Sequence, residues 1–334
     1  MPYHLPTSPT IAARCRAVTA GLLVLCVACA DDSAGPSSTA DLPADPPSSP
    51  VESTDVATAI LDTRSSRPGI VFASFSMSNA YLDNVHTGWM SGGALDPSNI
   101  LSDLSGARAK GGRVVIKLCK GRDRYVKNDD GTFSLTKWKS LVSRYRNVDL
   151  RPYISDGTII GHYLIDEPHR ASRWGGKAIS QATLEAMAKY SKELWPQMTT
   201  IVRVAPSYLA SASITYKYLD AGWTQYTVGK GDAANWVASE TAAAKRKGLG
   251  LVVGMNVLDG GNGSSNIRGW TSGKWAMSAS EIRNYGSAML GQSYACAFFN
   301  WTHDTDYYGR SDIKSAMADV SSKARSHEKT SCRQ

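Results

Sequence analysis

Short apolar runs alternate with amphipathic segments along most of the chain. Seven of these runs have strand length and are rich in β-branched or aromatic residues; they cover residues 69–75, 113–118, 159–166, 199–205, 222–228, 249–258 and 294–301. The segments between them carry helix-end signals. Ser134 and Ser180 precede two predicted helices, Ser278 to Glu281 form a capping box, Gly248 ends an Ala-rich helix, and Ser311 opens the last helix.

Strands that alternate with helices predict a parallel sheet covered by helices. Residues 68–334 form a stretch of 267 residues, close to the usual size of a (β/α)8 barrel. We therefore predict a TIM-type barrel that is distorted or has one irregular strand, because only seven strands are clear. The eighth strand is expected between Asn147 and Gly157 or at the end of the preceding linker. A doubly wound open sheet is the alternative, disfavoured because no GxGxxG sequence opens a helix after the first strand.

The N-terminal region departs from this pattern. Arg14 and Arg16 precede the apolar sequence AVTAGLLVLCVACA, which has the length of a signal-peptide core and is short for a transmembrane helix. We predict a signal peptide over residues 1–30, cleaved at Ala28-Cys29-Ala30 or at a lipobox-like site that leaves Cys29 lipidated. Residues 31–67 are rich in Pro, Ser and Asp and predict a disordered linker. These features predict export as a cell-envelope lipoprotein or an extracellular protein, with membrane contact only through a lipid anchor.

Composition narrows the classes of function. The chain is 42% hydrophobic, and its formal charge of +8 becomes about +6 (8 − 2) once Arg14 and Arg16 are removed. The basic residues are scattered, so nucleic-acid binding is not expected. Cys119, Cys296 and Cys332 follow the leader without a CxxC pair or a histidine cluster, so no metal site is predicted. Cys296 and Cys332 are the favoured disulfide pair because both would lie at the bottom of the barrel.

Polar and aromatic residues gather where the predicted strands end. In a (β/α)8 barrel the catalytic residues lie at the carboxyl ends of the strands. The residues at or just after those ends are Ser74, Ser76, Lys117, Asp166, Glu167, His169, Arg203, Ser207, Gln225, Tyr226, Asn256, Asp259, Asn300, Trp301, His303, Asp304 and Asp306. Carboxylates for acid–base chemistry, amides and arginine for hydroxyl groups, and aromatic rings for stacking are the expected lining of a sugar site.

The strand at 159–166 runs into the sequence Asp166-Glu167-Pro168. This sequence resembles the Asn-Glu-Pro strand end of secreted bacterial (β/α)8-barrel glycoside hydrolases. The resemblance implies that Glu167 is the general acid/base in hydrolysis of a glycosidic bond. It also implies a poly- or oligosaccharide substrate, no cofactor, and a sugar platform at Trp301. From their strand-end positions the expected sugar contacts are Trp301, Asn300, Gln225, Arg203, Lys117, Asn256 and Asp304.

That superfamily also has a second glutamate at the end of a late strand, and this sequence lacks one. The other glutamates lie in the linker, in the tail, inside predicted helices or in the capping box. The second carboxylate is therefore expected from an aspartate. Asp259, which ends a strand before two glycines, is the first choice, followed by Asp304 and Asp306. Asp166 is a further candidate as a direct partner of Glu167.

Other interpretations stay open at this point. The main alternative is a non-catalytic carbohydrate-binding surface lipoprotein that keeps the barrel without a working pair of carboxylates. Asp-Glu-Pro can also be a polar loop start, and Asp259 can be a turn residue or hold calcium or an anion in the loop DGGNGSS. Lys117 at a strand end raises the alternative of Schiff-base chemistry. His162, inside a strand, is interpreted as a hydrogen-bonded core residue.

Overall fold

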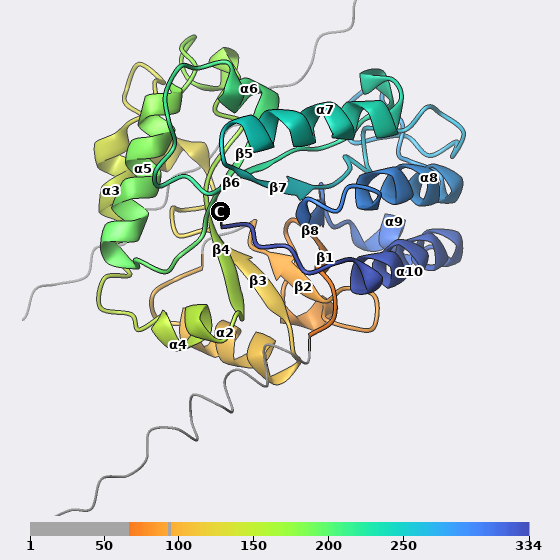
Figure 1. The fold of residues 1–334 in the computed structure, drawn as a ribbon, viewed down its shortest axis with the longest axis horizontal. Helices are drawn as coiled ribbons and strands as arrows, with labels where there is room; N and C mark the ends of the chain where they lie inside the picture. The colour runs from red at the N-terminus through yellow and green to blue at the C-terminus, as the bar shows by residue number, and fades with distance from the viewer. Residues whose placement is uncertain (1–66, 93–94, 334) are drawn as a thin grey trace, which may run out of the picture. The chain divides into compact units, whose positions relative to one another are not determined.

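The computed structural model describes residues 67–92 and 95–333. Its centre is a sheet of eight parallel strands: β1 (Val71–Ser74), β2 (Gly88–Met90), β3 (Arg113–Ile116), β4 (Ile159–Asp166), β5 (Thr200–Arg203), β6 (Ala221–Trp223), β7 (Gly250–Val253) and β8 (Ala295–Asn300). Each strand from β2 to β7 pairs with the next along the chain, and β8 pairs with β1. The helices lie around the outside of the strands (Figure 1). The predicted TIM-type barrel is confirmed.

The helices are α2 (Ile100–Ala109), α3 (Leu135–Ser143), α4 (Arg151–Ser155), α5 (Gln181–Leu194), α6 (Pro206–Ala210), α7 (Ala233–Arg246), α8 (Ala279–Leu290), α9 (Thr305–Gly309) and α10 (Ser311–Ser326), with short 3-10 turns η1 (Asn79–Tyr81), η2 (Asp123–Val126), η3 (Ala171–Arg173) and η4 (Val228–Lys230). The helix-end signals read from the sequence lie at the ends of α3, α5, α7, α8 and α10. Ser134 and Ser180 cap α3 and α5 through their side chains, and both hydrogen bonds of the Ser278–Glu281 capping box are present. Gly248, just beyond α7, adopts a left-handed φ of +63°.

The barrel has one seam, between β1 and β2, which form no ladder. Across this seam the Thr87 backbone N–H donates to the carbonyl of Phe72, the Phe72 N–H donates to Thr87 Oγ1, and one isolated bridge joins Phe75 to Met90. Gly88 leaves room on both sides of β2, because a Cβ at this position would lie 2.5 Å from Val71 Cγ2 across the seam and 1.9 Å from the carbonyl oxygen of Arg113 in β3. The seam is therefore closed by a few hydrogen bonds and one isolated bridge.

The eighth strand was expected between Asn147 and Gly157 or at the end of the linker, and both placements are wrong. Residues 151–155 of that segment form α4, and the missing strand is β2, Gly88–Met90. β2 has three residues, all buried. A strand that short and buried on both faces has no alternation for a periodicity argument to detect.

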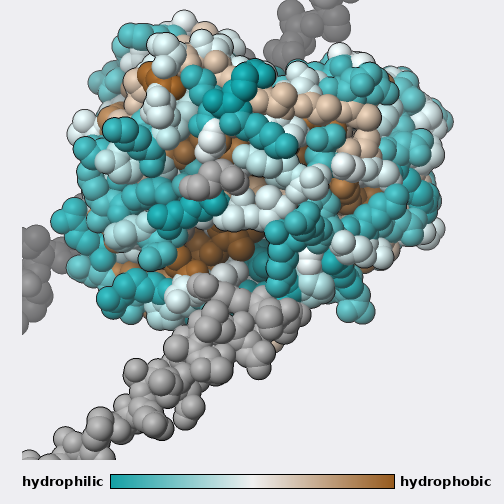
Figure 2. Space-filling model, viewed as in Figure 1, coloured by the Kyte–Doolittle hydropathy of each residue, from teal (hydrophilic) through white to brown (hydrophobic). Residues whose placement is uncertain are grey.

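Core side chains fill the barrel and the layer between strands and helices. The strands are buried along almost their whole length, as a parallel sheet covered on both faces requires. Inside the barrel, the rings of Phe75, Tyr163, Trp223 and Phe299 lie in edge or tilted contact with one another. In Figure 2, hydrophilic residues cover most of the visible face, and hydrophobic residues show mainly in the hollows between them.

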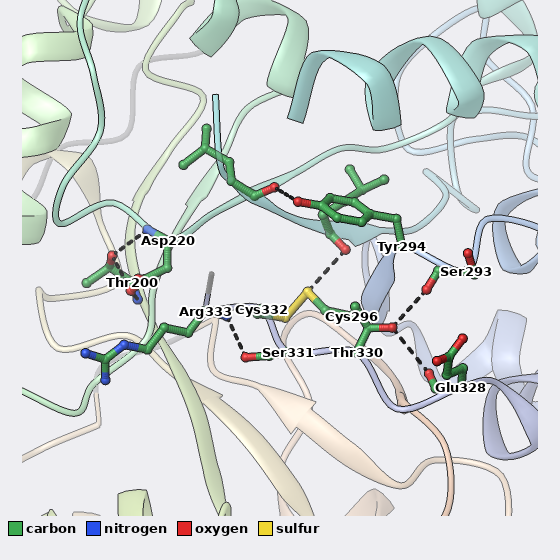
Figure 3. The surroundings of a disulfide bond; sticks show 12 residues. Thr200, Asp220, Ser293, Tyr294, Cys296, Glu328, Thr330, Ser331, Cys332 and Arg333 are labelled. Atoms are coloured by element: carbon green, nitrogen blue, oxygen red, sulfur yellow. Dashed lines mark hydrogen bonds between the residues drawn. A yellow bond between two sulfur atoms is a disulfide. The ribbon is translucent and has the colours of Figure 1, made fainter. Parts of the chain in front are cut away.

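A disulfide joins Cys296 in β8 to Cys332 in the C-terminal tail, the pair that the sequence favours, with 5.1 Å between the two Cα atoms. Figure 3 shows the tail held beside the start of β8, where Thr330 Oγ1 donates to the carbonyl of Ser293 at 2.8 Å. Cys119 is a buried free thiol.

Predictions about the N-terminal region have no structural counterpart here. The signal peptide, the lipidation site Cys29 and the linker up to Ser66 lie outside the described residues. Within residues 67–92 and 95–333, no helix is both long and apolar enough to span a membrane.

Candidate functional site

A cleft of about 240 Å³ opens at the carboxyl end of the barrel, where the ends of β4 to β7 meet. The predicted site residues that line it are Glu167, His169, Arg203, Gln225 and Asn256; they are joined by Arg170, Val204, Ala205, Trp223, Thr224, Thr227, Lys230 and Trp236. In the described part of the chain, Glu167 is the one carboxylate lining this cleft. The fold thus brings together polar strand ends that are up to 89 positions apart in sequence (256 − 167).

Glu167 follows the last residue of β4 and is held in an unusual backbone conformation. Its φ is +43°, a left-handed value that non-glycine residues rarely adopt. Trp174 Nε1 donates to the Glu167 carbonyl at 3.0 Å, which ties the backbone down at this point. Conformations of this kind persist only where the surroundings impose them, and they concentrate at functional sites.

Three arginines surround the Glu167 carboxylate. Oε2 accepts from Arg170 Nη1 at 2.8 Å and from Arg173 Nη1 at 3.1 Å, and Arg203 Nη1 lies 3.5 Å from Oε1. Charge-assisted contacts of this type are stronger than neutral hydrogen bonds. The carboxylate is therefore positioned by positive charge on one side and faces the cleft on the other.

Asp166 has a different role from its neighbour. Its side chain is buried, with Oδ1 2.5 Å from Arg203 Nη1 and Oδ2 2.6 Å from Arg173 Nη1. Burial opposes ionisation of Asp166, but the charges of Arg203 and Arg173 outweigh it and lower the pKa to about 2. Asp166 is thus a fixed anion that orients two arginines and is unsuited to donate a proton near neutral pH.

Arg203 links the charged cluster to the aromatic residues. Its Nη2 donates to Gln225 Oε1 at 2.6 Å, and its guanidinium carbon lies 4.1 Å from the centre of the Trp301 ring. Trp301 in turn stacks on Phe75, with 4.5 Å between ring centres. Trp301 therefore supports Arg203 at the rim of the site.

Several predicted residues lie away from the cleft. The Asp259 carboxylate accepts from Thr271, from its backbone N–H at 2.9 Å and its hydroxyl at 2.8 Å, within the loop after β7. Asp304 caps α9 by accepting from the Tyr307 N–H, and Asn300 is buried, with its side-chain oxygen accepting from the Met255 N–H. None of the three lines the cleft in the described residues.

Of Lys117 and the three histidines named from the sequence, only His169 lines the cleft. Lys117 is buried in the barrel, with its Nζ 5.6 Å from the centre of the Tyr163 ring, and it does not line the cleft. His162 is buried, its Nδ1 is 2.8 Å from Ser191 Oγ, and burial lowers its pKa to about 3, so it is a neutral core residue. His169 lines the cleft, and His303 packs against Tyr81.

The sequence reasoning missed Arg173, which organises the site. Arg173 lies in η3, and its Nη1 donates to both Asp166 and Glu167. Its Nε lies 2.5 Å from Asp123 Oδ2. Arg173 lies only six positions after Glu167, in the sequence DEPHRASR. A cation that close to two carboxylates is a local signal that could have pointed to it. Among residues 67–92 and 95–333, no group of three or more His, Cys, Asp or Glu is arranged to hold a metal ion.

No family model matches the sequence, and no curated protein is similar to it in sequence. Solved structures share its fold. An endo-beta-1,4-mannanase from Thermotoga petrophila superposes with a TM-score of 0.52 at 13% identity, over 80% of this chain and 79% of the mannanase. A beta-glucanase from Saccharophagus degradans gives a TM-score of 0.55 at 9% identity, over 77% of this chain and 88% of the glucanase. At these identities the likeness shows that the chain has the (β/α)8-barrel fold found in glycoside hydrolases.

Proposed function

We propose that the cleft at the carboxyl end of the barrel binds a poly- or oligosaccharide and that the protein hydrolyses one of its glycosidic bonds. The observation that carries this proposal is the Glu167 carboxylate, held at the end of β4 in a strained backbone and facing the cleft. The fold shared with a mannanase and a glucanase supports the choice of substrate class. In this proposal Glu167 transfers a proton to the leaving oxygen and Arg203, Gln225 and Asn256 bind hydroxyl groups.

This mechanism requires a second carboxylate close to Glu167. Retaining glycosidases hold two carboxyl groups about 5 Å apart and inverting ones about 6.5–9.5 Å apart. Asp259 remains the proposed partner, and it would have to exchange its contacts with Thr271 for contacts with substrate or water. Such a step requires the loop between Asp259 and Thr271 to rearrange when a glycan binds.

A second candidate function has its own support. A carbohydrate-binding protein without hydrolytic activity needs the cleft, its aromatic residues and its amides, but no second carboxylate. Glu167 is the one carboxylate among the described residues of the cleft, and arginines contact it. That arrangement favours binding over proton transfer.

The test is release of reducing ends from a broad polysaccharide panel by the full chain, with binding to the same glycans measured in parallel. Glu167→Gln keeps the shape of the side chain and is expected to lower the release rate by about 10²–10⁴-fold. Glu193→Gln, an exposed position on α5, is the matched control and should leave the rate unchanged. Asp259→Asn should be as inactive as Glu167→Gln if Asp259 is the partner.

Each outcome has a distinct meaning. Equal release by wild type and Glu167→Gln would remove Glu167 from the mechanism. Activity that survives Asp259→Asn would leave Asp259 as a loop residue and require another partner. Binding without any release would replace the hydrolase by the carbohydrate-binding protein.

A further inference from the structure

A second and larger pocket, of about 830 Å³, lies at the opposite end of the barrel from Glu167. Arg113 in its wall is the first residue of β3, Thr87 immediately precedes β2, and Arg67 lies shortly before β1. The pocket is therefore at the amino ends of the strands, where side chains in a (β/α)8 barrel ordinarily serve stability.

The pocket is strongly basic. Five cationic residues line it, namely Arg67, Arg108, Lys110, Arg113 and Arg325, against one carboxylate, Asp83. Arg108 forms an ion pair with Asp156, with 2.6 Å between Nε and Oδ2. The other four cations have no ion pair with a carboxylate among the described residues.

The Asp83 carboxylate accepts hydrogen bonds from its own loop. Its Oδ1 accepts from the backbone N–H groups of Val85 and His86 at 2.8 and 2.6 Å. Arg113 and Lys110 donate to backbone carbonyls, of Gly69 at 2.8 Å and of Asn79 at 2.7 Å, which satisfies donors without neutralising charge. The excess of positive charge in the pocket is therefore uncompensated by the side chains that line it.

Two of the arginines that line the basic pocket have buried nitrogens without a hydrogen-bond partner. Among the described residues, Arg67 Nη1 and Arg325 Nε are buried and form no hydrogen bond. A buried donor without an acceptor destabilises the protein, and clustered cations repel one another. Burial and, to a smaller extent, the charge of Arg67 lower the pKa of Arg113 to about 10.

We propose that this pocket is a binding site for a phosphate-bearing ligand. Guanidinium groups match the oxygens of phosphate in geometry and charge, and several of them converging on one site favour a multiply charged oxyanion. The volume of about 830 Å³ also accommodates the group that carries the phosphate. The ligand is either a soluble phosphate ester or the headgroup of a phospholipid, and the site is independent of the Glu167 cleft.

The test uses the full chain and two probes. Calorimetry with sn-glycerol 3-phosphate, with glycerol as the uncharged counterpart, detects a soluble ester. Co-sedimentation with vesicles of phosphatidylglycerol, compared with phosphatidylcholine, detects a lipid headgroup. We expect at least one phosphate probe to bind and both uncharged or zwitterionic counterparts to fail.

Matched double variants assign the site. Arg67→Gln with Arg325→Gln removes the two arginines that have unpartnered buried nitrogens, and affinity should fall at least tenfold. Arg146→Gln with Arg246→Gln removes the same charge at exposed positions outside the pocket and should change affinity less than twofold. Absence of binding to both phosphate probes, or equal losses in the two double variants, would overturn the proposal.

Thermal unfolding without ligand separates binding from a structural role. The pocket variant should unfold at the wild-type temperature or slightly above it, because it relieves repulsion and loses few contacts. A structural role for these arginines predicts a clear drop in melting temperature instead. A drop of more than a few degrees would count against the proposed binding site.

Discussion

Asp166 and Glu167 are adjacent carboxylates that share Arg173 and Arg203 as partners but differ in their access to the cleft. Asp166 is buried between Arg203 and Arg173, whereas Glu167 lines the cleft. The backbone of Glu167 has a left-handed φ of +43°, and Arg173 Nη1 contacts both carboxylates. The first residue therefore fixes the arginines, and the second presents a carboxylate to whatever enters the cleft.

Asp166→Asn is expected to lower the free energy of unfolding by about 3 kcal/mol at neutral pH, because two guanidinium groups would lose a buried anionic partner. Urea unfolding followed by tryptophan fluorescence measures this difference. Asp149→Asn, at a solvent-exposed ion pair with Arg151, is the control and should cost less than about 1 kcal/mol.

The difference between wild type and Asp166→Asn should depend on pH. The pKa of Asp166 is about 2 in the folded protein, below its ordinary value of 3.8. The ion pairs therefore contribute fully above about pH 4, and their contribution is lost as the pH falls toward 2. The two unfolding free energies should converge over this range, and a constant gap would contradict the assignment of the shift to Asp166.

At the scale of elements, the start of α8 anchors the loop that contains Asp259. Glu281 is buried and accepts from the N–H of Ser278, as a capping box requires, and also from the N–H of Asn262 at 2.8 Å. The Ser264 hydroxyl donates to the same carboxylate at 3.1 Å. One glutamate therefore caps a helix and holds the preceding loop against it.

Because Glu281 has this double role, Ser278→Ala and Glu281→Ala at the start of α8 should lower the free energy of unfolding by different amounts. Ser278→Ala should lower the unfolding free energy by about 1 kcal/mol, the usual value of a lost cap. Glu281→Ala should cost about 2 kcal/mol or more, because buried loop donors also lose their acceptor. Denaturant unfolding compares both with Ser180→Ala at α5, a simple cap; equal costs for all three would show that Glu281 does not anchor the loop.

At the scale of the whole barrel, the two ends differ in chemistry. The carboxyl end has the cleft with Glu167, and the amino end has the basic pocket and the disulfide that holds the C-terminal tail to β8. A disulfide is typical of oxidising compartments, which agrees with the predicted export signal. Export itself stays a prediction, since the leader lies outside the described residues.

The disulfide should contribute substantially to stability. It closes a loop with a sequence separation of 36, for which loop-closure entropy predicts about 3–4 kcal/mol. Replacing Cys296 and Cys332 by serine should therefore lower the melting temperature by about 10 °C, as measured by calorimetry. Cys119→Ala is the control for thiol loss and should have a smaller effect; an unchanged melting temperature in the double variant would show that the tail adds little.

The sequence by itself determined the features that depend on local pattern. Seven strands, the helix caps and the alternation that specifies a barrel could all be derived, because periodicity and end signals act over a few residues. The strand end at Asp166-Glu167-Pro168 was visible for the same reason. The strand β2 was not, because three buried residues have no period.

Apart from the Cys296–Cys332 disulfide, tertiary structure decided which distant residues meet. The contact of Arg173 with Asp123, 50 positions away, and the stacking of Arg203 on Trp301 follow from barrel closure and not from any local motif. The same holds for Asp259, which pairs with Thr271 after its loop folds back, and for the five cations gathered at the amino end. Side-chain partners are set by how strands and loops are brought together in space, and a linear pattern does not contain that arrangement.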